Sequence, residues 1–192
     1  MRILGIVCSP RKDGNTEIMV KEALEAAHEA GSETELILVA DKNIAPCDGC
    51  GSCRENGICR IQDDMQMIYE QLELADGVIL GTPVYFINVS AQAKAIIDRT
   101  YALMGTRKLR GKVAAAIIVA RRVGAGQVIG LLYSYFMSVG MRIAGAGIGY
   151  GEEKGDVKQG VGASSALSAL DEARGVGRNV VRLANQLAKG KS

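Results

Sequence analysis

Short apolar runs alternate with amphipathic segments along most of this chain, and this alternation limits the folds open to it. Runs rich in Val, Ile and Leu are predicted as buried strands at 2–7, 34–39, 77–80, 112–120 and 142–148. Helices are predicted at 16–30, 64–74, 90–103 and 127–139, and over the alanine-rich last 30 residues, where Gly175 and Gly177 weaken the helix. Strands that are apolar on both sides and alternate with helices predict an α/β domain with a parallel sheet.

The length and net charge of the chain limit the number of domains and the kinds of partner that it can have. Its 192 residues suit a single domain, and the net charge of +2 with scattered Lys and Arg argues against nucleic acid as a partner. The apolar run before Cys8 is about five residues long, too short for a signal peptide, and no stretch approaches the roughly 20 apolar residues of a membrane span. We therefore expect a cytoplasmic protein that binds neither nucleic acid nor membrane.

Residues 41–62 interrupt the alternation and contain four of the five cysteines. Cys47, Cys50, Cys53 and Cys59 have the spacing C-x2-C-x2-C-x5-C. In a reducing cytosol such a group is more typical of metal ligands than of disulfides. Consecutive two-residue gaps favour a [4Fe–4S] cluster, whereas zinc sites usually pair two C-x2-C units across a longer loop. Zinc and a thiol switch remain alternatives, and the separate Cys8 is interpreted as a small buried residue.

The first predicted strand is followed by SPRKDGNT, residues 9–16, and then by a helix. Ser9, Asn15 and Thr16 are short polar residues, and Arg11 adds a positive charge. Ligands of open α/β sheets bind at the carboxyl ends of the strands, and helix starts favour anions, so the segment is a candidate phosphate site. It has neither the P-loop pattern nor a G-x-G-x-x-G, and an ordinary helix-capping loop is the alternative.

Two further loops are expected at the same edge. GTPVYFINVS, residues 81–90, carries the adjacent aromatics Tyr85 and Phe86, which either wall a flat ring or serve the core and a subunit contact. ARRVGAGQ, residues 120–127, carries Arg121 and Gly124, and a positive charge there would stabilise a reduced, anionic flavin. The alternative for this loop is a solvated basic turn.

These motifs together resemble the iron–sulfur flavoproteins of archaea and anaerobic bacteria, within the NADPH-dependent FMN reductase-like group. The resemblance rests on SPRKDGNT, on CDGCGSCRENGIC, on GTPVYF leading into SAQAKAIIDR, and on GYGEEKGDV. It implies a flavodoxin-like three-layer sandwich over residues 1–192, with a five-stranded parallel sheet of order 2-1-3-4-5 and the cysteine loop at 41–62. It also implies FMN, with its phosphate at Ser9, Arg11, Asn15 and Thr16 and its ring bordered by Pro83, Val84, Tyr85 and Phe86, and a [4Fe–4S] cluster on the four cysteines.

The functional hypothesis follows from the number of electrons that each cofactor transfers at a time. A cluster passes single electrons and a flavin accepts one or two, so we expect ferredoxin or a similar one-electron donor and a small acceptor such as oxygen, peroxide or a quinone. The alternatives are an NAD(P)H-dependent FMN or quinone reductase without a cluster, and a non-catalytic carrier or redox sensor. The family implies a homodimer or homotetramer, for which Tyr133, Tyr135 and Phe136 would suit a contact surface, and the alternative is that these aromatics belong to the core. Asp98 and Arg99 are predicted to be a surface pair on a helix.

Overall fold

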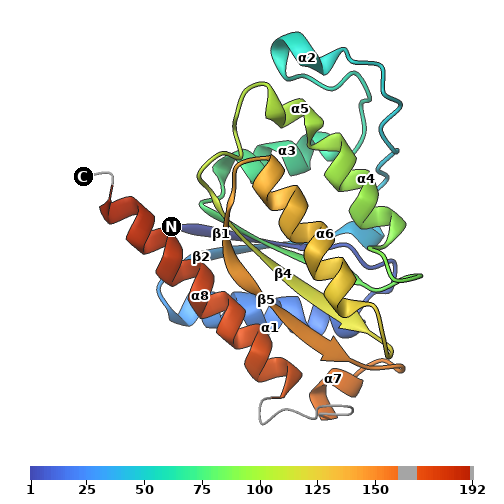
Figure 1. Cartoon of the computed structure of the whole chain (residues 1–192), viewed down its shortest axis with the longest axis vertical. Coiled ribbons are helices and arrows are strands. Elements are labelled where there is room, and N and C mark those ends of the chain that lie inside the picture. The colour runs from blue at the N-terminus through green and yellow to red at the C-terminus, as the bar shows by residue number, and fades with distance from the viewer. Residues whose placement is uncertain (160–167, 191–192) are drawn as a thin grey trace.

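A five-stranded parallel sheet forms the centre of the molecule (Figure 1). The computed structural model describes residues 1–159 and 168–190. The strands are β1 (Arg2–Val7), β2 (Glu33–Leu38), β3 (Gly77–Pro83), β4 (Val113–Ala120) and β5 (Arg142–Tyr150). Their order is β2-β1-β3-β4-β5, which confirms the predicted topology, and the chain switches direction along the sheet between β1 and β3.

Helices cover both faces of the sheet and make three layers. One face carries α1 (Asn15–Glu29) and α8 (Ala169–Lys189), and the other carries α3 (Met65–Leu74), α4 (Ala91–Arg99) and α6 (Ala125–Ser138) (Figure 1). Each face has its own apolar core. Leu4, Ile6 and Leu80 point into the core under α3, α4 and α6, while Ile3 and Val7 point into the core under α1 and α8, as the two-residue period of a strand requires.

The short elements lie in the connections. They are η1 (Val39–Asp41), α2 (Cys53–Asn56), α5 (Tyr101–Met104) and α7 (Asp156–Gln159). The single helix predicted at 90–103 is wrong in one respect, because it is divided into α4 and α5 at Thr100. The Thr100 hydroxyl donates to the carbonyl of Ile97 (2.7 Å) and lies 3.0 Å from the Tyr135 hydroxyl. Threonine side chains that bond to the preceding turn commonly bend a helix.

Helix α8 continues through both of its glycines. The parts of the predicted C-terminal helix at 163–167 and 191–192 lie outside the described residues, and α8 begins at Ala169 with a capping box between Ser168 and Asp171. A Cβ on Gly177 would lie 2.0 Å from the carbonyl oxygen of Ala23 in α1. Gly177 therefore allows the two helices to approach closely, rather than marking a weak point.

The aromatics of α6 belong mainly to the core. Phe136 is buried and its ring lies 5.5 Å from that of Tyr135, whose burial raises its pKa to about 12. Phe136 is therefore a core residue and not part of a contact surface, which agrees with the alternative, and Tyr133 is half-buried. Among the helices of the described residues, none is both long and apolar enough to cross a membrane.

Candidate flavin edge and cysteine cavity

The loop between β1 and α1 ends in a helix start that carries no side-chain cap. Gly14 occupies the N-cap position of α1, and no side chain of the described residues bonds to its first amides. The first amides of a helix have no partner within the helix, and the helix dipole places partial positive charge there. By contrast, α4 is capped by Ser90, whose hydroxyl accepts from the amide of Ala93. The uncapped start of α1 has the properties of an anion site.

The four residues predicted to hold the phosphate differ in their surroundings. Ser9 and Thr16 are buried, and the Ser9 hydroxyl accepts from the amide of Arg11 at 3.1 Å. Arg11 itself is exposed. Both amide atoms of Asn15 bind the loop after β5: its Nδ2 donates to the carbonyl of Glu153 (2.8 Å), and its Oδ1 accepts from the amide of Gly155 (2.7 Å). Asn15 thus joins the first and last strand-end loops, a contact that sequence reasoning missed.

The β3–α4 loop carries a tight turn at residues 85–88. The amides and carbonyls of Tyr85 and Asn88 exchange hydrogen bonds of 2.9 and 3.0 Å. The two residues between them have positive φ, +48° at Phe86 and +60° at Ile87. Such turns favour Asn and Gly, so bulky residues in this conformation are strained and are typical of functional sites. The Phe86 side chain is fully exposed, and Tyr85 is also exposed.

The β4–α6 loop packs directly against this turn. Gly124 has φ +96°, and a Cβ there would lie 2.9 Å from Cγ1 of Val84 and 3.1 Å from Cα of Ile87. Only glycine permits this approach without strain. Arg121, on the same loop, forms an exposed ion pair with Glu152, which offsets part of its charge.

Three buried residues connect the ends of β1 and β3, and the sequence did not reveal them as a set. The amide of Cys8 donates to the carbonyl of Gly81 (2.8 Å), and the Ser90 hydroxyl donates to the carbonyl of Cys8 (2.5 Å). The amide of Ser90 in turn donates to the hydroxyl of Thr82 at 3.1 Å. Burial raises the pKa of the Cys8 thiol, which keeps it neutral, as expected for a small buried residue.

The carboxyl edge of the sheet therefore combines an anion site with uncovered apolar side chains. Phe86, Ile87 and Val123 are large hydrophobic residues that remain exposed beside the strand ends. A flat heteroaromatic ring joined to a phosphate fits this combination, because the ring would cover the apolar groups and the phosphate would satisfy free amides. The residues present thus fit FMN at this edge, which we call the flavin edge.

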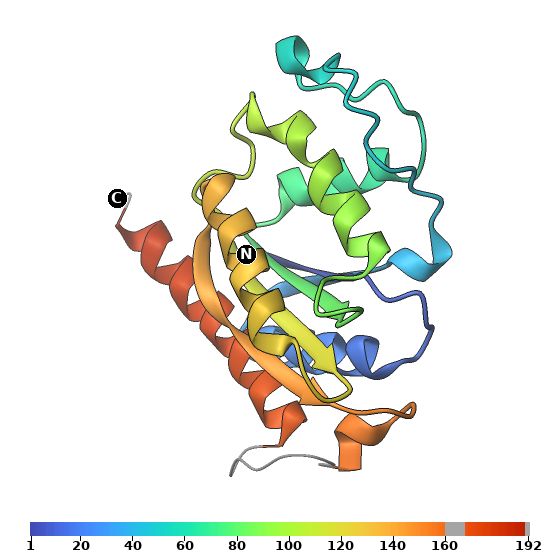
Figure 2. The same ribbon diagram turned by 45° about the vertical axis from the view of Figure 1, so that its right-hand side comes forward.

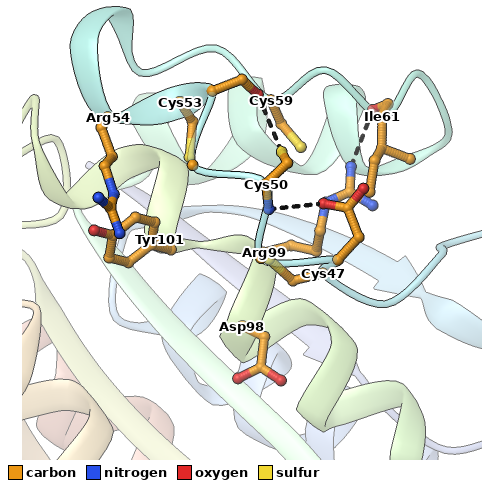
Figure 3. Close-up of a pocket in the computed structure, with 13 residues that line it drawn as sticks. Cys47, Cys50, Cys53, Arg54, Cys59, Ile61, Asp98, Arg99 and Tyr101 are labelled. Carbon is orange, nitrogen blue, oxygen red and sulfur yellow. Dashed lines mark hydrogen bonds between the residues drawn. The ribbon is translucent and has the colours of Figure 1, made fainter.

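The four clustered cysteines line one cavity of about 450 Å³, which we call the cysteine cavity (Figure 3). Its wall also contains Arg54, Ile61, Asp98, Arg99 and Tyr101. Cys47 and Cys50 are exposed, Cys53 is half-buried and Cys59 is buried. Apart from α2, residues 42–64 contain no helix or strand.

The thiols of this cavity have unequal environments. Hydrogen bonding to Ser52 lowers the pKa of Cys50, whereas burial raises the pKa of Cys53. Within residues 1–159 and 168–190, no three His, Cys, Asp or Glu side chains lie close enough to hold a metal ion as they stand. The donor set and the cavity fit a thiolate-bound cluster, although its four sulfurs would have to converge to bind one.

Arg99 is not a surface residue, contrary to the prediction. Its side chain is fully buried, and it forms a two-pronged ion pair with Asp63, with Nη1 to Oδ2 at 2.8 Å and Nη2 to Oδ1 at 3.0 Å. Asp98 is the exposed neighbour and pairs with Lys94 instead. The sequence carried one signal for this, because Arg99 lies three residues after the buried Ile96 and therefore on the buried side of α4.

The cysteine cavity lies at the far end of α4 from the flavin edge. Helix α4 begins at the end of β3, and its last turn provides Asp98 and Arg99 to the cavity. Figure 2 shows α2 and the cysteine loop at the top of the molecule, well away from the arrowheads that mark the carboxyl ends of the strands. The cysteine loop leaves β2 at the carboxyl edge of the sheet, but it is long enough to run along α3 and α4 to the other end of the molecule.

Comparisons with known proteins identify the family. Residues 1–153 match the family described as NADPH-dependent FMN reductase. An iron-sulfur flavoprotein of Methanocaldococcus jannaschii is 39% identical over 199 residues, which cover 98% of this chain and 100% of that protein. An iron-sulfur flavoprotein of Methanosarcina thermophila is 40% identical over 148 residues, which cover 76% of this chain and 78% of that protein.

Solved structures share the fold at low identity. RosB with a bound 8-demethyl-8-formylriboflavin-5'-phosphate superposes with a TM-score of 0.79 at 20% identity, covering 100% of this chain and 82% of RosB. A WrbA-like flavodoxin of Agrobacterium tumefaciens gives a TM-score of 0.63 at 18% identity, covering 96% and 97% of the two chains. With its flavodoxin-like fold, the chain belongs to the iron–sulfur flavoproteins of the NADPH-dependent FMN reductase family and is an FMN-dependent oxidoreductase.

Proposed function

We propose that this protein holds a [4Fe–4S] cluster on Cys47, Cys50, Cys53 and Cys59 and FMN at the flavin edge. In this proposal the chain accepts single electrons from a ferredoxin-like donor at the cysteine cavity. It delivers them in pairs to a small acceptor, such as oxygen, peroxide or a quinone, at the flavin edge. The observation that carries the proposal is that the four clustered cysteines line one cavity of about 450 Å³ in a chain of this family.

The residues of the flavin edge have separable roles in this proposal. The first amides of α1, with Ser9, Thr16 and Arg11, bind the phosphate. Pro83, Val84, Tyr85 and Phe86 border the ring and exclude water from it. Gly124 holds the turn at 85–88 in place, and Arg121 supplies positive charge near the ring. Bound FMN would supply the two-electron chemistry, since a flavin exchanges electrons one or two at a time.

The distance between the two sites bears on assembly. Helix α4 has nine residues, and at 1.5 Å per residue it is about 14 Å long. A second copy of the chain that brings its own cysteine cavity to this flavin edge would shorten the path. We therefore propose that the protein acts as a homodimer or homotetramer, which light scattering at micromolar concentration tests. A 20 kDa monomer would contradict this part of the proposal.

Metal analysis and reduction kinetics test the proposal directly. Protein purified without air should show a broad absorbance shoulder near 400 nm and contain about four iron atoms per chain, the stoichiometry of a cubane. Reduced ferredoxin should then reduce the FMN much faster than NADPH does. Zinc in place of iron would refute the cluster, and equal rates with both donors would refute the route through the cysteine cavity.

A second candidate is supported by the description of the family itself. As an NADPH-dependent FMN reductase, the chain would accept hydride directly at the flavin edge, and the cysteine cavity would have no part in the reaction. Rapid reduction by NADPH in protein free of iron would favour this candidate. The same experiment thus separates the two.

A further inference from the structure

The buried Arg99 contacts both ends of the cysteine loop. Its Nη1 donates to the carbonyl of Ala45 (2.9 Å), just before Cys47, and its Nη2 donates to the carbonyl of Ile61 (3.1 Å), just after Cys59. Asp63 accepts from the same two nitrogens and also from the amide of Ala45 at 2.8 Å. One guanidinium and one carboxylate therefore fix the two ends of the loop side by side.

The ion pair presents its positive partner to the cysteine cavity. Arg99 belongs to the cavity wall and Asp63 does not, so the positive partner is the nearer one. Figure 3 shows Arg99 beside the cysteines, with its side chain reaching toward Ile61. Arg54, the other positive residue of the wall, is exposed and therefore screened by water, and so is Arg60, which pairs with Asp48 of the wall.

One donor of Arg99 has no acceptor. Its Nε is buried and unpaired, one of two such side-chain atoms among the described residues. Buried donors are nearly always satisfied in folded proteins, so an unpaired one needs an explanation. Nearby, the Tyr69 hydroxyl donates to the main-chain carbonyl of Arg99 at 2.9 Å, and the buried Cys59 acts electrostatically on both side chains.

We propose that the Arg99–Asp63 ion pair is a positioning element for the cluster, a role that rests on the proposed function. The pair holds the cysteine loop closed before iron arrives, so that the four thiols already share one cavity. Once a cluster is bound, the guanidinium favours its reduced state, which carries one more negative charge, and Nε–H is the free donor for Cys59 or a cluster sulfur. Net charge and hydrogen bonds to sulfur are the main protein contributions to a cluster potential.

The first test uses metal-free protein, so it does not depend on whether a cluster forms. The variants are Arg99→Met, Arg99→Lys and Asp63→Asn, and Arg54→Gln is the matched control because it removes a positive charge from the same cavity wall. Amide hydrogen exchange over residues 42–62 should accelerate at least tenfold in Arg99→Met and Asp63→Asn and stay unchanged in Arg54→Gln. Unchanged exchange in all variants would overturn the positioning role.

The second test measures the midpoint potential of the iron-loaded protein by an EPR-monitored redox titration. Arg99→Met should lower the potential by about 59 mV, the equivalent of a tenfold loss in the equilibrium for a one-electron step. Arg99→Lys should lower it less because it keeps the charge, and Arg54→Gln should change it least. An equal shift for Arg54→Gln and Arg99→Met would overturn the specific role of Arg99.

Two observations keep the tests interpretable. Bound FMN per chain reports on the fold, because the flavin edge lies at the other end of α4. If Arg99→Met fails to bind FMN, Arg99→Lys carries the hydrogen-exchange test and should show the same acceleration, since it loses the two-pronged geometry. Absence of iron from the wild-type protein would refute the proposed function but leave the hydrogen-exchange test of the ion pair valid.

Discussion

The two ends of helix α4 show two ways of building a site. At its start, the Ser90 hydroxyl donates to the carbonyl of Cys8 at the end of β1, and the Ser90 amide donates to the Thr82 hydroxyl on β3, so the sheet determines the geometry of the flavin edge. At its end, the cysteine loop is not paired with a strand, and the ion pair between Arg99 and Asp63 fixes its two ends instead. Helix α4 is thus held by hydroxyl hydrogen bonds where it adjoins the strands, and by an ion pair where it adjoins the irregular cysteine loop.

The difference also predicts different sensitivities. Main-chain bonds at the flavin edge are numerous and individually modest, each contributing about 1 kcal/mol. The buried ion pair is a single element whose loss leaves an uncompensated charge. Damage at the flavin edge should therefore be graded, whereas damage at the cysteine cavity should be abrupt.

The largest expected effect is the loss of iron from the cysteine cavity while the flavin edge keeps its FMN. Cys50→Ser should remove most of the iron and abolish reduction by ferredoxin, because a cubane requires four thiolates, while FMN per chain stays unchanged. Iron analysis and flavin absorbance of the same sample measure both. Cys8→Ala is the matched control, since Cys8 is buried between strand ends and lies outside the cysteine cavity. Loss of iron in Cys8→Ala as well would break the comparison.

The second effect concerns stability. Asp63→Asn should lower the free energy of unfolding of the metal-free protein by about 3–5 kcal/mol, because it leaves the Arg99 charge buried without its partner. Asp98→Asn removes the neighbouring exposed pair with Lys94 and should cost at most about 0.5 kcal/mol. Urea unfolding followed by circular dichroism measures both variants. A similar loss in the two would show that burial does not distinguish the pairs.

The same ion pair predicts a pH dependence. Burial opposes ionisation of Asp63, but hydrogen bonds from Arg99 and from the amides of Ala45 and Met65 lower its pKa below the usual 3.8. A carboxyl whose pKa is lower in the folded than in the unfolded state stabilises the fold at any pH above its unfolded-state pKa. This stabilisation is lost as the pH falls through the folded-state pKa. The difference in unfolding free energy between wild type and Asp63→Asn should therefore be constant near neutrality and shrink below pH 3.8. A difference that persists at lower pH would contradict this assignment.

A smaller effect is expected at the flavin edge. Gly124→Ala should destabilise the protein by about 1–2 kcal/mol and weaken FMN binding, because a Cβ meets Val84 and the backbone is left-handed. Gly130→Ala, in the same region but within α6 and with open space around it, should instead stabilise by about 0.5–1 kcal/mol. Thermal unfolding with and without FMN compares them. Opposite signs for the two substitutions sharpen the comparison.

The smallest effect concerns one exposed charge. Arg11→Ala should weaken FMN binding by about tenfold, the lower end expected for a hydrogen bond to a charged group, and riboflavin binding should be little affected. Fluorescence titration with both ligands measures the change. Equal losses for FMN and riboflavin would mean that Arg11 does not contact the phosphate.

Sequence reasoning succeeded wherever a local pattern decided the outcome. The apolar runs predicted the five strands to within a few residues, and the family resemblance supplied the order of the sheet. It failed where a partner distant in the sequence decided the outcome. Arg99 and Asp63 are 36 residues apart and Asn15 reaches a loop 138 residues away, so no window of sequence could pair them. The course of the cysteine loop along α4 was missed for the same reason.

The paired ends of the cysteine loop give the protein a modular construction. The Asp64 amide also donates to the carbonyl of Asn43, and the Asn43 amide donates to the Asp64 carboxylate, so the two ends of the loop lie side by side. Closing such a junction with a short turn costs little chain entropy. We therefore expect that residues 46–60 can be shortened or exchanged without moving the strands, because the junction that holds them lies outside the segment. The groups that fasten the segment, Arg99 and Asp63, belong to the scaffold side of the junction, so a replacement segment would meet the same two anchors.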